Sequence, residues 1–138
     1  MTKTLFVSIF LVACVSMSLS SRPAQAQSNF GCACLHNRTN VTIDYTYRWG
    51  EADWRRINLQ PNHTESHCWR YESGATSSPR LQIRLDVDMS RETAWKTYDL
   101  PRAQSATNRC SAAIPNSSVF DISYQTGTQE RYIVVTHR

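Results

Sequence analysis

The stretch VTIDYTYRW, residues 41–49, decides the expected fold because its apolar and polar side chains alternate strictly. Odd-numbered positions carry valine, isoleucine, tyrosine and tryptophan, whereas even-numbered positions carry threonine, aspartate and arginine. Successive side chains of a β-strand point to opposite faces, so a period of two predicts a strand with one buried face. The stretch RLQIRLDVDM, residues 80–89, alternates in the same way. Both stretches are therefore expected in an antiparallel sheet with one solvated face.

Shorter stretches of the same kind continue along the chain, separated by segments rich in Gly, Pro, Asn and Ser that are typical of turns. The further expected strands are 32–36, 54–59, 65–71, 95–100, 119–125 and 131–137. No stretch shows the period of a helix. The pattern predicts an all-β fold, an antiparallel β-sandwich of immunoglobulin-like architecture with about seven or eight strands. A small β-barrel is the second choice.

The N-terminus has the features of an export signal. An apolar run over residues 5–19 follows a basic start, and Ala24 and Ala26 are the small residues that a signal peptidase recognises. The run is shorter than the roughly 20 residues of a membrane-spanning helix. We therefore predict that residues 1–26 are a cleaved secretory signal peptide. Residues 27–138 are then a single disulfide-linked β domain, secreted or periplasmic, with no membrane span.

A second interpretation of the N-terminus is lipidation. The sequence LVAC, residues 11–14, resembles a bacterial lipobox, in which the cysteine becomes the lipidated N-terminus. Cys14 comes early and the apolar run continues beyond it, which favours ordinary cleavage. Lipidation would instead anchor the domain to the cell envelope.

Four cysteines follow the signal, namely Cys32, Cys34, Cys68 and Cys110. An even number in an exported chain predicts two disulfides. In an extended segment, Cβ atoms two residues apart are separated by nearly 7 Å, whereas a disulfide needs roughly 3.5 to 4.5 Å. Cys32 and Cys34 are therefore expected to bond different partners. We predict Cys34–Cys68 with Cys32–Cys110, and the exchanged pairing is the alternative.

The same cysteines have a competing interpretation as metal ligands. Cys32, Cys34 and His36 alternate on one face, and His67 adjoins Cys68. Thiolate and imidazole groups bind zinc or copper. However, zinc sites usually use cysteines two to four residues apart, and exported thiols tend to oxidise. We therefore expect disulfides here, no bound metal and no cofactor.

The candidate binding residues come from YTYRWGEADWRR, residues 45–56. Two tryptophans flank a short connection and are expected to face each other across a hairpin end, with arginines alongside. Exposed tryptophans form platforms that stack on sugar rings or anchor a partner protein, and arginine binds acidic groups. The competing interpretation is cross-strand packing within the core. The candidate residues are Trp49, Trp54, Arg48, Arg55 and Arg56.

Other side chains are expected to be structural. Trp69 and Trp95 are predicted to lie in the core. Asp86 and Asp88 share one strand face, where they are expected to pair with Arg84 or meet water rather than bind calcium. No nucleophile, carboxylate pair or phosphate loop has a recognisable catalytic setting, so we expect no enzymatic activity.

Charge excludes one class of partner. Residues 27–138 carry thirteen basic and eleven acidic side chains, and this balance of +2 is no nucleic-acid footprint. We expect a monomeric, secreted or periplasmic binding module for a protein or glycan partner. The alternatives are an envelope-associated structural protein and an inhibitor of a secreted hydrolase that presents the loop 72–79.

Overall fold

A computed structural model describes residues 27–138, which form nine strands and one short 3-10 helix. The expected signal peptide and the lipobox cysteine lie outside the described residues. The elements are β1 (Phe30–Asn37), β2 (Ile43–Trp49), β3 (Arg55–Leu59), β4 (Thr64–Arg70), β5 (Leu81–Asp86), β6 (Trp95–Asp99), β7 (Ala103–Ser105), η1 (Asn116–Ser118), β8 (Val119–Tyr124) and β9 (Ile133–His137).

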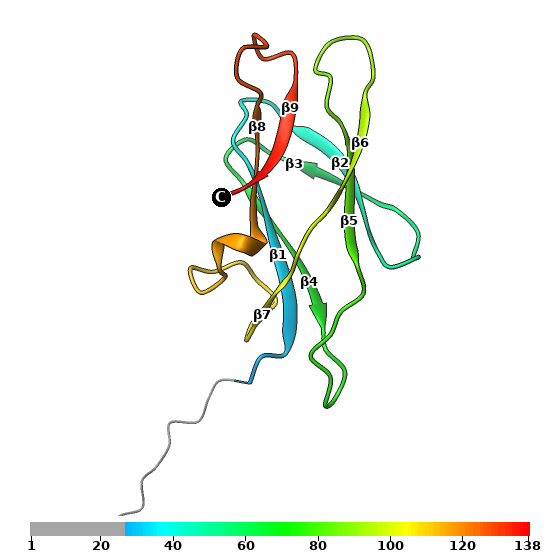
Figure 1. Cartoon of the computed structure of the whole chain (residues 1–138), viewed down its shortest axis with the longest axis vertical. Coiled ribbons are helices and arrows are strands. Elements are labelled where there is room, and N and C mark those ends of the chain that lie inside the picture. Colours follow the sequence, from blue (N-terminus) through cyan, green and yellow to red (C-terminus); the bar gives the residue numbers. More distant parts are fainter. Residues whose placement is uncertain (1–26) are drawn as a thin grey trace, which may run out of the picture.

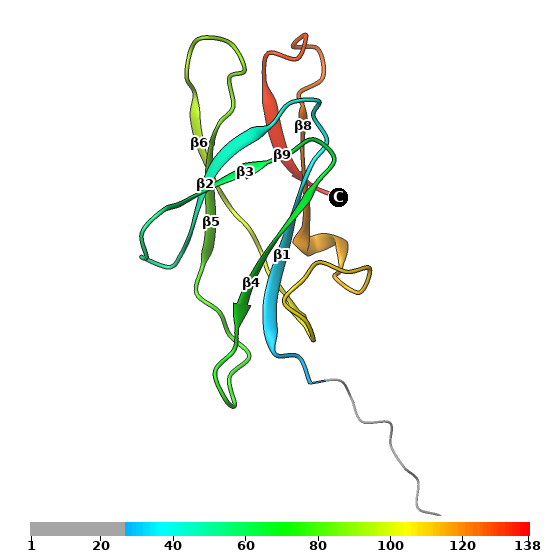
Figure 2. The same cartoon turned by 180° about the vertical axis from the view of Figure 1, so that it is seen from behind.

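The strands form two sheets that pack face to face (Figures 1 and 2). The five-stranded sheet has the order β4-β1-β8-β9, with β7 also paired to β1, and the four-stranded sheet has the order β3-β2-β5-β6. The predicted β-sandwich is confirmed, and residues 27–138 do not close into the barrel considered as second choice. Strands form at all eight expected stretches, and β7 is an additional strand. The pairing departs from a purely antiparallel pattern because β1 and β8 run parallel.

The main core lies between the sheets, where the inward positions of the strands meet. It contains Leu35 of β1, Tyr45 of β2, Ile83 and Leu85 of β5, and Ile122 of β8, each 1% exposed or less. These residues occupy alternate positions along their strands, as a half-buried sheet requires. The alternation in residues 41–49 and 80–89 therefore records which side of the four-stranded sheet faces inward.

β1 is buried on both faces because it lies inside the five-stranded sheet and a second apolar cluster covers its outer side. Cys32 and Cys34 point outward and meet Ile114 and Val119. The segment 106–118 carries Ile114 and lies over these side chains. We call the outer side of the five-stranded sheet, with this segment over it, the covered face.

The disulfides pair Cys32 with Cys68 and Cys34 with Cys110, so the predicted pairing is wrong and its alternative is correct. The cause is strand register: β1 and β4 pair with Cys32 directly opposite Cys68, and Ser66 lies opposite Cys34. The backbone N–H of Cys110 donates to Ser66 Oγ at 2.9 Å, which brings Cys110 to Cys34. As expected, Cys32 and Cys34 do not bond each other.

The two sheets are joined at one corner. Beyond β5 the chain continues toward β9, where the N–H of Ile133 donates to the carbonyl of Val87 at 3.0 Å. The N–H of Met89 donates to the carbonyl of Arg131 at 2.7 Å. The β5–β6 and β8–β9 turns consequently lie side by side at the top of Figure 1.

Candidate binding face on the four-stranded sheet

The outward side chains of β3, β2, β5 and β6 form an exposed surface, which we call the open face. Strand register places its side chains in rows across the sheet. One complete row runs from Arg56 through Thr46 and Arg84 to Thr97. A second row contains Arg48, Gln82 and Asp99.

The structure divides the five candidate residues between the two sides of the sheet. Arg48 and Arg56 point outward on the open face, whereas Arg55 pairs with Tyr47 at an inward position of the pleat, at the sheet edge where it is exposed. Trp49 packs against the core, with its ring centroid 5.4 Å from that of Trp69. Trp54 lies beneath the guanidinium of Arg48, which is 4.7 Å from the ring centroid. The two tryptophans therefore have different neighbours and do not form one platform.

The row around Arg48 is occupied by internal contacts. Arg48 Nε donates to Gln82 Oε1 at 2.9 Å, and Gln82 Nε2 donates to Asp99 Oδ1 at 3.0 Å. Asp99 also forms an ion pair with Arg80. The hydrogen bond from Arg80 holds the pKa of Asp99 below its usual value. Because these polar groups bind one another, this row offers a ligand few free hydrogen-bonding groups.

Trp95 is the most exposed large apolar side chain of the described residues, at 56% exposure, so its predicted core position is wrong. The reason is the pleat of β6, in which Trp95 pairs with Asp86 and therefore points outward with Thr97 and Asp99. Tyr98 occupies the opposite position and packs against the core. The sequence also indicates this position, because Trp95 alternates with Tyr98 and therefore points to the same side of the strand as the threonine and the aspartate.

The cations beside Trp95 differ in their partners. The guanidinium of Arg84 lies over the indole at 5.3 Å from the ring centroid. No ion pair among residues 27–138 includes Arg84. Arg56, by contrast, binds the carboxylate of Asp44 at 2.6 Å, which holds the pKa of Asp44 below its usual value.

A hollow of about 230 Å³ lies beside Trp95. The other residues that line it come from β2 and β3, and the surface exposed to the hollow is almost entirely apolar. The lining residues are Asp44, Tyr45, Thr46, Arg56 and Trp95. An apolar hollow beside an exposed indole can cover the apolar side of a ligand.

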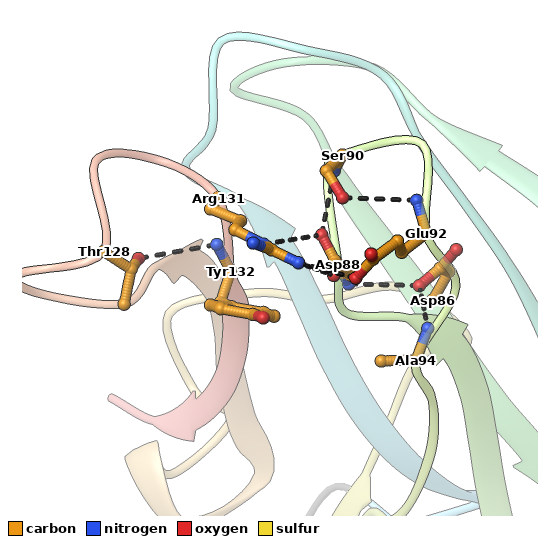
Figure 3. Close-up of polar contacts among 8 residues, drawn as sticks. All are labelled: Asp86, Asp88, Ser90, Glu92, Ala94, Thr128, Arg131 and Tyr132. Atoms are coloured by element: carbon orange, nitrogen blue, oxygen red, sulfur yellow. Dashed lines mark hydrogen bonds and ion pairs between the residues drawn. The ribbon is translucent and has the colours of Figure 1, made fainter.

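The turn before Trp95 is fixed by carboxylates (Figure 3). Asp86 accepts hydrogen bonds from the N–H groups of Asp88 at 3.0 Å and Ala94 at 2.8 Å. Asp88 is buried and pairs with Arg131 at 3.0 Å, and Arg131 also binds Glu92 at 2.8 Å. These contacts connect the β5–β6 turn to the β8–β9 turn, so they fix where β6 begins and where Trp95 points.

The same contacts decide the environment of Asp88. Hydrogen bonds from Arg131 and Ser90 lower the pKa of the Asp88 carboxyl to about 2. Asp88 thus pairs with Arg131 rather than with the expected Arg84. Within residues 27–138 no group of three or more His, Cys, Asp or Glu side chains is arranged to hold a metal ion.

A larger hollow of about 1050 Å³ lies at the opposite end of the sandwich, where residues 27–30 meet residues 70–76. Its lining includes part of the loop considered for an inhibitor and consists mostly of polar residues. It lacks an exposed large aromatic side chain and is therefore the weaker candidate.

Comparison with protein-family models, with curated proteins and with solved structures finds no match to this chain. No helix within residues 27–138 is long and apolar enough to cross a membrane.

Proposed function

We propose that this protein is a secreted or periplasmic, non-enzymatic module that binds a protein or glycan partner through the open face. The observation that carries the proposal is Trp95, which is exposed beside a hollow and lies under an arginine without a carboxylate partner. Tryptophan and arginine are enriched among residues that dominate binding energy. The centre of the proposed site therefore moves from Trp49 and Trp54 to Trp95 and Arg84.

The scaffold supports this proposal because a rigid sheet holds the side chains in place before a partner arrives. Strand pairing fixes the spacing of the rows, and the carboxylates of Asp86 and Asp88 brace the turn before Trp95. Preorganisation of this kind reduces the entropy that binding costs. The two disulfides support export, because such bonds persist in oxidising compartments.

The test is partner recovery by wild-type protein and by a Trp95→Ala variant, each immobilised and exposed to a glycan array and to proteins of the secreting cell. We expect Trp95→Ala to lose the recovered partner, because truncating a central tryptophan removes most of its contact area. Trp54→Ala is the matched control, since Trp54 also lies under an arginine but is only partly exposed and does not line the hollow. Equal recovery by wild type and Trp95→Ala would contradict the proposal.

A further inference from the structure

We propose that the hollow beside Trp95 binds one pyranose ring of an acidic glycan, with the carboxylate of a hexuronic acid paired to Arg84. This inference rests on the proposed function, because it names the ligand of the same open face. It follows from three properties of the site: the size of the hollow, the chemistry of its lining, and the ion pairing of the arginines beside it.

The hollow has the dimensions of a subsite for one ring. Its volume is about 230 Å³, below the roughly 300–1,000 Å³ of pockets that enclose a drug-sized ligand. It is set in the exposed surface of a sheet, so the rest of a chain can continue across the neighbouring rows. An oligomer bound there therefore places one unit against Trp95 and leaves the adjoining units on the sheet surface.

The hollow matches the apolar side of a sugar ring. A pyranose has an apolar C–H face, which stacks on the indole of Trp95, and hydroxyl groups at its edge. The surface exposed to the hollow is almost entirely apolar, so it can cover this C–H face. Asp44 and Arg56 bind each other, so the orientation of the ligand is fixed by the pairing of its carboxylate with Arg84.

The charge of the ligand follows from Arg84. Arg56 and Arg80 on the open face already bind carboxylates, whereas no ion pair of the described residues includes Arg84. The nearby carboxylate of Asp86 accepts two backbone N–H groups. A guanidinium binds a carboxylate through two parallel hydrogen bonds. Arg84 lies over part of the indole, so a hexuronate ring stacked on the exposed part of Trp95 can pair its carboxylate with Arg84. A neutral sugar would leave Arg84 without a partner.

A protein partner fits these properties less well. Protein interfaces bury about 800 Å² on each partner, and their centres are enriched in aromatic residues and depleted of aspartate and glutamate. On the open face, the side chains around Trp95 include Asp44 and Asp86, and no second exposed aromatic of the described residues accompanies it. A polar surface with one stacking platform is better suited to a hydroxylated, charged chain.

The experiment is calorimetric titration of the exported protein, purified from the periplasm of an expression host with its disulfides formed. The probes are a galacturonic acid oligomer and a neutral galactose oligomer of equal length. We expect the acidic oligomer to bind at least about tenfold more tightly, and added salt to weaken it. Equal affinity for the two oligomers would overturn the assignment of Arg84 to a carboxylate.

Two pairs of variants locate the site. Arg84→Gln should reduce the affinity for the acidic oligomer to that for the neutral one, whereas Arg80→Gln, a matched change at a paired arginine, should leave it within about twofold. Trp95→Ala should lower the affinity for the acidic oligomer about 30-fold, whereas Trp54→Ala should leave this affinity unchanged. Unchanged affinity in Arg84→Gln or Trp95→Ala would place the oligomer elsewhere and overturn the inference.

The outcomes also separate this inference from the proposed function. If the acidic oligomer does not bind but another partner is recovered in a Trp95-dependent manner, the inference is wrong and the proposed function stands. If no partner depends on Trp95, both are wrong. Circular dichroism of each variant shows that a lost interaction is not a loss of fold.

Discussion

The two outer faces of the sandwich follow the same pleat and have opposite characters. On the covered face, Cys32, Cys34 and Val119 are buried beneath Ile114 of the segment 106–118. On the open face, the corresponding outward positions carry arginine, aspartate, threonine and the exposed Trp95. The covered face thus acts as a second core, whereas the open face exposes Trp95 and charged side chains to solvent.

Strand alternation alone therefore does not decide which side of a sheet is buried. Two outward positions of β1 are cysteines, and they are covered because a disulfide holds the segment 106–118 over them. The outward positions of β6 have no such segment, so Trp95 remains at the surface. Cross-linking accounts for the covered face, and no disulfide of the described residues reaches the open face.

The largest expected effect is on the covered face. Replacing Cys34 and Cys110 together by alanine removes a cross-link that spans 76 residues and should lower the free energy of unfolding by about 4 kcal/mol. Urea unfolding without reductant, compared with wild type, measures this loss. A loss below about 1 kcal/mol would show that the segment 106–118 is held without its disulfide.

A pH titration probes the core between the two faces. His67 is buried, hydrogen-bonded to Tyr45 at 2.7 Å, and burial lowers its pKa to about 4. In the unfolded chain the imidazole of this histidine has its ordinary pKa near 6.5, so it binds a proton at a higher pH than it does in the fold. The free energy of unfolding should therefore fall by about 3 kcal/mol as the pH drops from 6.5 toward 4. Urea midpoints between pH 7 and pH 4 should fall steeply in wild type and less in His67→Gln. If the urea midpoint falls equally with pH in wild type and in His67→Gln, this role of His67 is contradicted.

A pair of single substitutions compares the faces directly. Ile114→Ala on the covered face should cost about 2 to 3 kcal/mol, because it leaves a cavity over the disulfides. Trp95→Ala on the open face should cost less than about 1 kcal/mol, the scale of its contact with Arg84. Chemical unfolding of both variants gives the two values. Similar losses would mean that Trp95 is a core residue after all.

A separate prediction concerns the corner that positions Trp95. Asp88→Asn removes the ion pair with Arg131, so the melting temperature should fall and binding through Trp95 should weaken. Because the pKa of Asp88 is lowered to about 2, its stabilising effect is present above pH 4 and disappears as pH falls toward 2. The melting temperatures of variant and wild type should therefore converge at low pH. A difference in melting temperature that does not change with pH would assign the effect to packing instead of the ion pair.

The sequence was sufficient for the sandwich because alternation reports one buried face per strand. Residues 41–49 and 80–89 each become the strand that they predict. β7 (Ala103–Ser105) was missed because three residues are too short to show a period. The parallel pairing of β1 with β8 was also not predictable, since alternation carries no information about which strands become neighbours.

The candidate site is predictable only in part, because the sequence does not show which residues of neighbouring strands lie opposite each other. The disulfide pairing depends on Cys32 lying opposite Cys68, which spacing along the chain does not determine. Trp49 and Trp54 are close in sequence but meet Trp69 and Arg48 respectively. Residue type places Trp95 in the core, although its position two and four residues before Thr97 and Asp99 places it on their side of β6, the open face. For Trp95, position within the strand is therefore a better guide to exposure than hydrophobicity.

The most direct test of the open face is an NMR titration of the isotope-labelled protein, with its disulfides formed, with the galacturonic acid oligomer. We expect the largest shifts at the indole N–H of Trp95 and at the amides of residues 44–46 and 84–86. Residues 106–119 of the covered face should remain unperturbed. Shifts centred on the covered face or on the hollow at residues 70–76, or no shifts at all, would contradict binding at the open face.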